Sequence, residues 1–155
     1  MAATVNVNGR VFDQDHAVIS VFDHGFLYGE GVYETWRTYN GQPFLYDRHM
    51  RRLRNSAGMI ELAVPISDDE MDVRCRETMR AAGLGEGSGE AYVRVLLTRG
   101  VGELSYDPAG CPAPSIIIIV KPHVAPAASA YERGVTVALV PIVRNHPGSV
   151  NPLRA

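Results

Sequence analysis

The sequence has few cysteines and no long hydrophobic run. Its two cysteines, Cys75 and Cys111, lie far apart and belong to no CxxC or Cys/His cluster, so we expect free thiols and no metal site. The longest apolar run, residues 116–120, is far too short to cross a bilayer. The N-terminal residues Met-Ala-Ala-Thr-Val-Asn are too polar for a signal peptide. These absences favour a cytoplasmic protein that has no membrane partner.

Lysine is almost absent, and neither sign of charge dominates. Of the 15 cationic residues, Lys121 is the only lysine. Acidic and basic residues are interleaved and the formal net charge is −2, which gives no electrostatic reason to expect nucleic acid or an anionic membrane as a partner. A chain of 155 residues with ordinary apolar and charged fractions fits one globular domain and excludes collagen, coiled coil and disorder.

The N-terminal part has the composition of short strands joined by tight turns. Thr4–Val7 and Arg10–Phe12 flank an Asn-Gly turn and predict a first hairpin. Val32–Tyr39 has strand composition and ends at Asn40-Gly41, the dipeptide favoured in tight hairpins, so we expect Pro43–Tyr46 to be its partner strand.

Two helices are predicted in the middle of the chain. Asp47 can cap a helix in which apolar residues recur at helical spacing, namely Met50, Leu53, Ala57 and Ile60. The capping box Ser-Asp-Asp-Glu at 67–70 opens a second helix, which should end near Gly83.

The remainder of the chain again favours strands. In Ala91–Thr98 the residues alternate, with Val93 on one face and Tyr92 and Arg94 on the other. Ser115–Val120 is apolar throughout, and Gly134–Val143 is expected to form a last strand. The fold class predicted from this order is α+β, a mostly antiparallel sheet with two packed helices.

Residues 22–37 are the most informative segment. Three closely spaced glycines alternate with aromatic residues there: Gly25, Gly29 and Gly31 with Phe26, Tyr28 and Tyr33. Glycines at this spacing let the backbone approach a ligand, and the aromatic faces beside them suit a planar polar molecule. A glycine-punctuated turn with core aromatics fits the same pattern, so the pattern alone leaves both interpretations open.

Motifs along nearly the whole chain resemble the class IV, pyridoxal-phosphate-dependent aminotransferases. The similar segments are Asp-His-Gly-Phe-Leu-Tyr-Gly-Glu-Gly-Val-Tyr-Glu from 23, His-Met-Arg-Arg-Leu from 49, Tyr-Val-Arg from 92, Thr-Arg-Gly-Val-Gly-Glu-Leu from 98, and Arg-Asn-His-Pro from 144. The resemblance is strongest to the branched-chain aminotransferases. D-amino-acid aminotransferases and aminodeoxychorismate lyases share the fold and remain alternatives, as does a non-catalytic dimerising domain.

The resemblance implies two domains with the cofactor, pyridoxal 5'-phosphate, between them. Residues 1–122 are similar to the smaller N-terminal domain, and 123–155 to the interdomain linker and the first strand of a truncated larger domain. The family's Schiff-base lysine would fall at Ala155 or just beyond it, and Lys121 does not match its motif. We therefore expect no catalytic residue in this chain, and no transamination by the chain alone.

The resemblance also assigns roles to five side chains. Arg52 matches the arginine that grips the cofactor phosphate, and a guanidinium fork suits an oxyanion. Tyr33, Tyr92 and Arg94 match substrate-binding positions, although the pocket aromatic at Tyr33 is usually phenylalanine in the family. Tyr28 matches a substrate-side tyrosine that reaches into the neighbouring subunit, which implies a homodimer. Without the family, spacing alone reads Arg52 as a surface arginine and Arg94 as part of an exposed strand face.

The activity that these matches imply is a ping-pong amino-group transfer. The expected substrates are branched-chain L-amino acids and 2-oxoglutarate, that is, a small amino acid and a 2-oxo acid. His24 and His49 lie within family motifs but lack metal-ligand spacing, so we expect structural hydrogen bonds from both.

Overall fold

The computed structural model describes residues 2–85 and 87–141, and these fall into two units. The first unit runs to His123 and the second begins at Val124. All the strands of the described residues lie in the first unit, as does the candidate site. The described part of the second unit contains one short helix, α4 (Ala128–Arg133).

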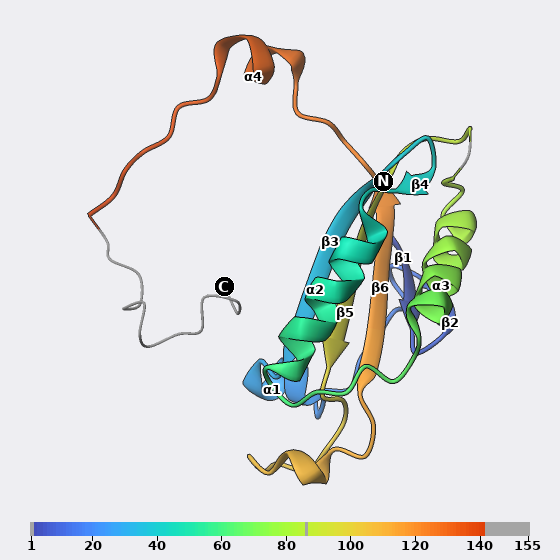
Figure 1. The fold of residues 1–155 in the computed structure, drawn as a ribbon, viewed down its shortest axis with the longest axis vertical. Coiled ribbons are helices and arrows are strands. Elements are labelled where there is room, and N and C mark those ends of the chain that lie inside the picture. Colours follow the sequence, from blue (N-terminus) through green and yellow to red (C-terminus); the bar gives the residue numbers. More distant parts are fainter. Residues whose placement is uncertain (1, 86, 142–155) are drawn as a thin grey trace. The chain divides into compact units, whose positions relative to one another are not determined.

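The first unit is built on a six-stranded sheet with the order β2-β1-β6-β5-β3-β4, in which every neighbouring pair is antiparallel (Figure 1). The strands are β1 (Thr4–Val7), β2 (Arg10–Asp13), β3 (Gly31–Tyr39), β4 (Gln42–Pro43), β5 (Ala91–Thr98) and β6 (Ser115–Pro122). β5 and β6 pair along their full length and form the centre of the sheet.

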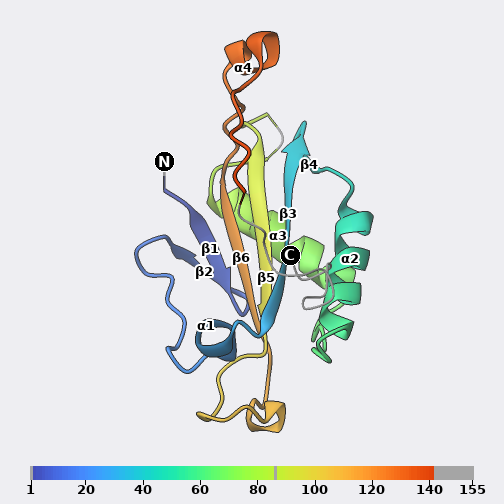
Figure 2. The same cartoon turned by 90° about the vertical axis from the view of Figure 1, so that its left-hand side faces the viewer.

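Helices α2 (Tyr46–Gly58) and α3 (Asp68–Ala81) cover one face of this sheet (Figure 2). The core between them combines the alternating inner residues of the strands with the apolar stripes of both helices: Trp36, Val93, Val95, Ile118 and Val120 with Met50, Leu53, Met71, Cys75 and Met79. The predicted α+β fold, an antiparallel sheet with two packed helices, is confirmed.

The second predicted helix is confirmed in detail. The hydroxyl of Ser67 accepts a hydrogen bond from the backbone N–H of Glu70 at 3.1 Å, as a capping box requires. Helix α3 then ends at Ala81, and Gly83 follows with φ of +68°. A positive φ is inexpensive only for glycine, so the chain turns where the sequence indicated.

The first predicted helix begins differently from the expectation. Asp47 does not cap α2: the capping position is Leu45, whose φ is +53°, and Asp47 lies in the first turn. The same turn shortens the preceding strand. The backbone N–H of Phe44 still donates to Arg37, but the left-handed residue at 45 takes the chain out of the sheet, so the predicted strand Pro43–Tyr46 is wrong and β4 is only Gln42–Pro43.

Four further elements depart from the sequence-based expectations. Helix α1 (His24–Tyr28), the 3-10 turn η1 (Pro108–Gly110) and helix α4 were not predicted. The expected last strand, Gly134–Val143, is absent over 134–141, where the described residues form no ladder with another strand; residues 142 and 143 lie outside the described part. A strand needs a neighbour for its backbone N–H and C=O groups, and its apolar residues alone do not supply one.

In the described residues, no helix combines the length and apolarity that a bilayer span needs.

Candidate functional site

A buried carboxylate on β3 holds the predicted cofactor-binding arginine. Glu34 is only 4% exposed and faces α2. Arg52 donates to this carboxylate from Nε, and from Nη2 at 2.7 Å. His49, one helical turn away, places Nδ1 2.7 Å from the same carboxylate. Burial alone would raise the pKa of Glu34, but the hydrogen bonds from Arg52 and His49 outweigh it and hold the pKa below its ordinary value.

This arrangement leaves part of the Arg52 guanidinium available. A guanidinium carries five N–H donors, and Glu34 accepts from Nε and Nη2. The Arg52 side chain is 64% exposed, so its outer donors face solvent while its inner edge is fixed. A positively charged fork oriented in this way can bind an oxyanion such as a phosphate.

Two of the predicted substrate residues meet on the opposite face of the sheet. The guanidinium carbon of Arg94 lies 4.9 Å from the centre of the Tyr33 ring, a cation–π contact. Arg94 Nε also lies 3.3 Å from the hydroxyl of Thr35, the residue paired with it across β3 and β5. These contacts position the Arg94 side chain beside an exposed aromatic ring.

Tyr92, the third predicted substrate residue on this face, lies between two cationic residues of the neighbouring strands. Strand register places Arg37, Tyr92 and Lys121 side by side on β3, β5 and β6. Lys121 Nζ lies 5.1 Å from the centre of the Tyr92 ring.

The rows beside this one contain no acidic residue: Thr35, Arg94, Ile119, Val5 and Phe12 form one, and Tyr33, Leu96, Ile117, Val7 and Arg10 the other. A face with these side chains favours an anionic ligand, such as a carboxylate.

Arg52, which could bind a phosphate, and Arg94, which could bind a carboxylate, lie on opposite faces of the sheet, but both contact β3. Tyr33 and Glu34 are consecutive, and alternation sends their side chains to opposite faces. Along residues 31–37 β3 pairs with β5, whereas among the described residues β4 borders its other edge only at Thr38 and Tyr39. A ligand at this open edge can therefore contact residues from both faces. The structure does not place Arg52 on the face that holds Tyr33, Tyr92 and Arg94.

Tyr28 lies apart from these residues, at the end of α1. Its ring makes an edge-to-face contact with His24 at 4.8 Å and lies 5.0 Å from the ring of Tyr106, in the loop after β5. No ring or cation–π contact joins Tyr28 to Tyr33 or Arg94. Tyr28 thus belongs to a separate aromatic group built from α1 and the loop at 101–106.

Helix α1 is short, and long-range hydrogen bonds fix it. Asp23 caps the helix by accepting from the Gly25 N–H at 2.8 Å, and its second oxygen accepts from the Thr98 hydroxyl at 2.9 Å. The buried ring of His24 donates from Nε2 to the carbonyl oxygen of Glu103 at 2.8 Å. The expectation of structural hydrogen bonds from His24 and His49 is confirmed.

Sequence reasoning missed Glu34 and Thr35. Glu34 alternates with Trp36, so the two side chains share the buried face of β3, and a carboxylate on a buried face requires a cationic partner. That signal could have paired it with an arginine of α2. Thr35 shares its face with Tyr33, but its contact with Arg94 depends on strand register, which the sequence does not specify.

The chain is similar to proteins of known families. The family model described as amino-transferase class IV matches residues 31–153. A Methanocaldococcus jannaschii protein named as a branched-chain-amino-acid aminotransferase is 41% identical over 118 residues, which cover 76% of this chain and 40% of the relative. The aminodeoxychorismate lyase of Bacillus subtilis is 33% identical over 117 residues, covering 76% of this chain and 39% of the relative.

A solved structure shares the fold. The branched-chain amino acid aminotransferase of Escherichia coli superimposes with a TM-score of 0.83 and 28% identity, covering 97% of this chain and 50% of that one. The chain thus spans about 40% of the length of the curated relatives that it matches. With a family model matched over most of its length, the chain belongs to the class IV aminotransferases.

Proposed function

We propose that the protein containing this chain transfers amino groups between branched-chain L-amino acids and 2-oxoglutarate with pyridoxal 5'-phosphate as cofactor. Family membership supports the reaction type. The observation that carries the substrate class is the contact of Arg94 with Tyr33, on a sheet face whose three rows contain cations and apolar residues but no acid.

The residues present fit the proposed cofactor. Arg52 would hold its phosphate, because Glu34 fixes one edge of the guanidinium and leaves the Nη1 group directed away from that carboxylate. Glu34 is negative and would repel a phosphate if it were exposed, but it is buried and paired. A cofactor held there would lie beside β3, whose edge along residues 31–37 pairs with no further strand in the described residues. When bound, the cofactor supplies the electron sink for amino-group transfer.

The residues on the other face would bind and orient the amino acid. The terminal N–H groups of Arg94 can form charge-assisted hydrogen bonds with a substrate carboxylate, while Nε is held by Thr35. The exposed Tyr33 ring lies under the same guanidinium and would cover one side of the substrate. Fixing the carboxylate in this way restricts which groups of the substrate face the cofactor.

Aliphatic side chains near Arg94 favour an apolar substrate. Register pairs Arg94 with Ile119 on β6, and the next row places Leu96 beside Ile117. A carboxylate held by Arg94 would leave the rest of a branched-chain amino acid next to these residues. The hydroxyl of Tyr33 adds a polar group to this surface, so aminodeoxychorismate lyase and D-amino-acid aminotransferase activities are the alternatives.

The test is a substrate screen with the full-length protein loaded with pyridoxal phosphate. We expect L-leucine, L-isoleucine and L-valine to yield glutamate from 2-oxoglutarate. Arg94→Gln should raise KM for these amino acids about tenfold or more, because a charge-assisted hydrogen bond contributes roughly 1.5–3 kcal/mol. Arg51→Gln, an exposed arginine on α2, is the matched control and should leave KM unchanged.

Other results would overturn the substrate assignment. Release of pyruvate from 4-amino-4-deoxychorismate, without glutamate formation, would identify a lyase. Exclusive use of D-alanine would identify a D-amino-acid aminotransferase. An unchanged KM in Arg94→Gln would remove Arg94 from the substrate site whichever reaction is found.

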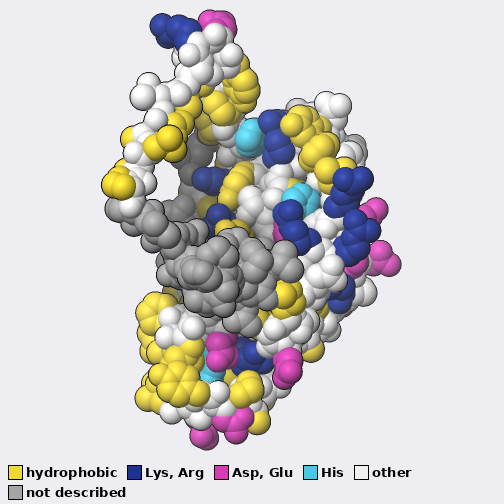
Figure 3. All heavy atoms as spheres, turned by 60° about the vertical axis from the view of Figure 1, so that its left-hand side comes forward, with side chains coloured by type: hydrophobic (Ala, Val, Ile, Leu, Met, Phe, Trp, Pro, Cys, Tyr) yellow, Lys and Arg dark blue, Asp and Glu magenta, His cyan; other side chains and the backbone are white. Residues whose placement is uncertain are grey.

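We also propose a homodimer in the cytoplasm. Apolar side chains around Tyr28 support the dimer: Phe26 is 65% exposed and Tyr106 is 84% exposed. Figure 3 shows hydrophobic side chains gathered at the lower end of that view, over α1 and the loop after β5. Exposed apolar clusters of this kind mark protein interfaces.

The free thiols of Cys75 and Cys111 support a reducing compartment.

Sedimentation equilibrium tests this assembly. We expect a dimer for the native protein and a shift toward monomer for Phe26→Ser, with Val73→Ser on the exposed side of α3 as control. A native monomer at micromolar concentration would contradict the proposal. The domain assignment is likewise proposed: residues 1–122 are the smaller domain, and 123–155 are the interdomain linker and the first strand of the larger one.

A further inference from the structure

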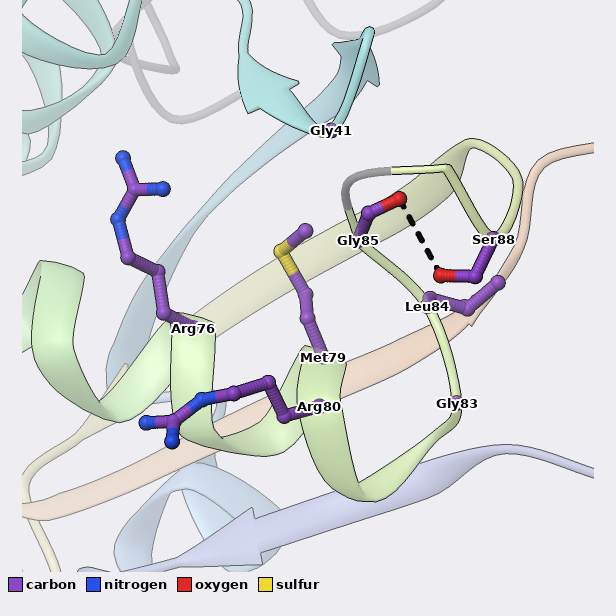
Figure 4. A pocket seen from close by; sticks show the side chains of 8 residues that line it. All are labelled: Gly41, Arg76, Met79, Arg80, Gly83, Leu84, Gly85 and Ser88. Atoms are coloured by element: carbon purple, nitrogen blue, oxygen red, sulfur yellow. Dashed lines mark hydrogen bonds between the residues drawn. The ribbon is translucent and has the colours of Figure 1, made fainter.

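A cleft lies in the first unit, away from the candidate site. It has a volume of about 510 Å³ and is formed by the last turns of α3, the turn at Gly41 and the glycine-rich loop that follows α3 (Figure 4). Gly41 follows the C-terminal end of β3, whereas Tyr33 is near its start. At about 3.3 Å per residue, the two positions are roughly 25 Å apart along the strand.

The floor of this cleft is apolar. Met79 and Leu84 line it and are 3% and 7% exposed, so their side chains are part of the core and present only a small apolar surface. In Figure 4 the Met79 side chain points into the space between the arginines of α3 and the loop. A cleft of several hundred Å³ with such a floor and a few polar groups has the character of a small-molecule site.

On the loop side of the cleft, the backbone of two glycines has free space around it. Gly83 and Gly85 have φ of +68° and +143°, and a Cβ atom added to either would meet no atom within 4 Å. These glycines are therefore not required by close packing, and they leave backbone accessible at the wall of the cleft. Ser88 adds a hydroxyl, which donates to the Gly85 carbonyl oxygen at 3.2 Å.

Two arginines provide the charge on the opposite wall. Arg76 is largely engaged, since Nε donates to Asp72 at 2.7 Å and Nη2 lies 3.3 Å from the amide oxygen of Gln42. Arg80, one turn later, is exposed and has no ion-pair or hydrogen-bond partner for its side chain among the described residues. Among the described residues that line this cleft, the spare positive charge is therefore that of Arg80.

The end of α3 does not cancel this charge. The last carbonyl groups of a helix repel anions when they are exposed. Here the N–H of Gly83 donates to the Arg80 carbonyl oxygen at 3.0 Å, and the N–H of Leu84 to that of Met79 at 2.9 Å. With both carbonyls hydrogen-bonded within the loop, an anion beside Arg80 faces a cation and not bare backbone oxygen.

We propose that this cleft is a second small-molecule site, and that it binds a carboxylate with an apolar body. The carboxylate would pair with Arg80, and the apolar body would lie on Met79 and Leu84. A phosphate without an apolar part would leave the floor of the cleft uncovered, and a neutral apolar molecule would leave Arg80 unpaired. The proposal rests on the cleft alone and does not depend on the reaction proposed above.

The test is an NMR titration of the 15N-labelled protein with hexanoate. Hexanoate should shift the backbone amides of Gly83, Leu84, Gly85 and Ser88 in a saturable manner. Hexanamide, which has the same apolar body without charge, and acetate, which lacks the apolar body, should produce much smaller shifts. Arg80→Gln should weaken hexanoate binding about tenfold, the usual effect of losing a hydrogen bond to a charged group.

Three variants separate this site from other cationic surfaces. Arg51→Gln, on α2, should leave the titration unchanged. Arg94→Gln removes the candidate substrate position and should also leave the cleft shifts unchanged, so failure of the proposed function would be seen separately. Arg80→Glu should abolish the shifts. Equal binding of hexanamide, or hexanoate shifts that persist in both Arg80 variants, would refute the proposal.

Discussion

Arg52 donates two hydrogen bonds to the buried carboxylate of Glu34, so the orientation of an exposed cation is set by a residue that has almost no contact with solvent. His49 shares the same carboxylate. The charge that would bind the cofactor phosphate is thus positioned from within the core, on the face of β3 that lies opposite Tyr33.

Replacing Glu34 should therefore weaken cofactor binding, although Glu34 itself would not contact the cofactor. Glu34→Gln keeps the shape but removes the charge that fixes Arg52, and we expect about a tenfold rise in the dissociation constant for pyridoxal phosphate, from the loss of a charge-assisted contact. Fluorescence titration of the full-length protein measures it. Arg54→Gln is the control, because Arg54 pairs with Asp68 and not with Glu34. An affinity equal to that of the native protein would show that Arg52 is held by other means.

The same carboxylate should make the protein sensitive to acid. Because the pKa of Glu34 in the folded state lies below its ordinary value of 4.5, its contribution to stability is complete above pH 4.5 and is lost as the pH falls through the folded-state value. Urea unfolding of native protein and Glu34→Gln at several pH values should show a difference in unfolding free energy that shrinks as the pH falls below 4.5. A difference that stays constant between pH 7 and pH 3 would contradict this linkage.

Two glycine substitutions should have opposite effects on stability. A Cβ atom on Gly100, where φ is +94°, would lie 1.9 Å from the carbonyl oxygen of Ala113, so Gly100→Ala should cost several kcal/mol or prevent folding. A Cβ atom on Gly58, at the end of α2, would meet nothing within 4 Å. Gly58→Ala should stabilise by about 0.5–1 kcal/mol. Thermal denaturation would compare the two, and equal melting temperatures would argue against the loop geometry around Gly100.

The two thiols should differ in reactivity. Burial raises the pKa of Cys75 to about 12, and its side chain has no exposed surface. Burial also raises the pKa of Cys111, but this residue is only partly covered. A thiolate-specific reagent at pH 8 should label Cys111 slowly and Cys75 only after unfolding. Mass spectrometry after timed labelling would show this order, and faster labelling of Cys75 in the folded protein would be inconsistent with its burial.

Much of the fold could be predicted because the sequence patterns that indicate its strands and helices are local. The alternation in Ala91–Thr98 and the capping box at Ser67 are patterns of neighbouring residues, and both appear in the structure as expected. Helix α1 could not be found in this way. Its five residues are too few to show periodicity, and the contacts that fix it join His24 to Glu103 and Asp23 to Thr98, far along the chain.

The placement of the candidate site residues could be predicted in part, for the same reason. Resemblance to the family selected Arg52 from a run of arginines, and in the structure Arg52 is the arginine of that run that contacts Glu34, while Arg54 contacts Asp68. Alternation placed Tyr92 and Arg94 on one face. The separation of Arg52 from that face depends on which side of the sheet α2 covers, and this is a property of tertiary packing.

The alternation along β3 has a consequence for how the specificity of such a protein can diverge. Positions 33, 35 and 37 lie on the face of the proposed substrate residues, whereas 34, 36 and 38 are buried on the other face, where Glu34 holds Arg52. If the proposed site is right, exchanges at positions 33, 35 and 37 would change substrate preference while the core and the contact of Glu34 with Arg52 are kept. A single-residue insertion in this strand would swap the two sets and destroy both at once.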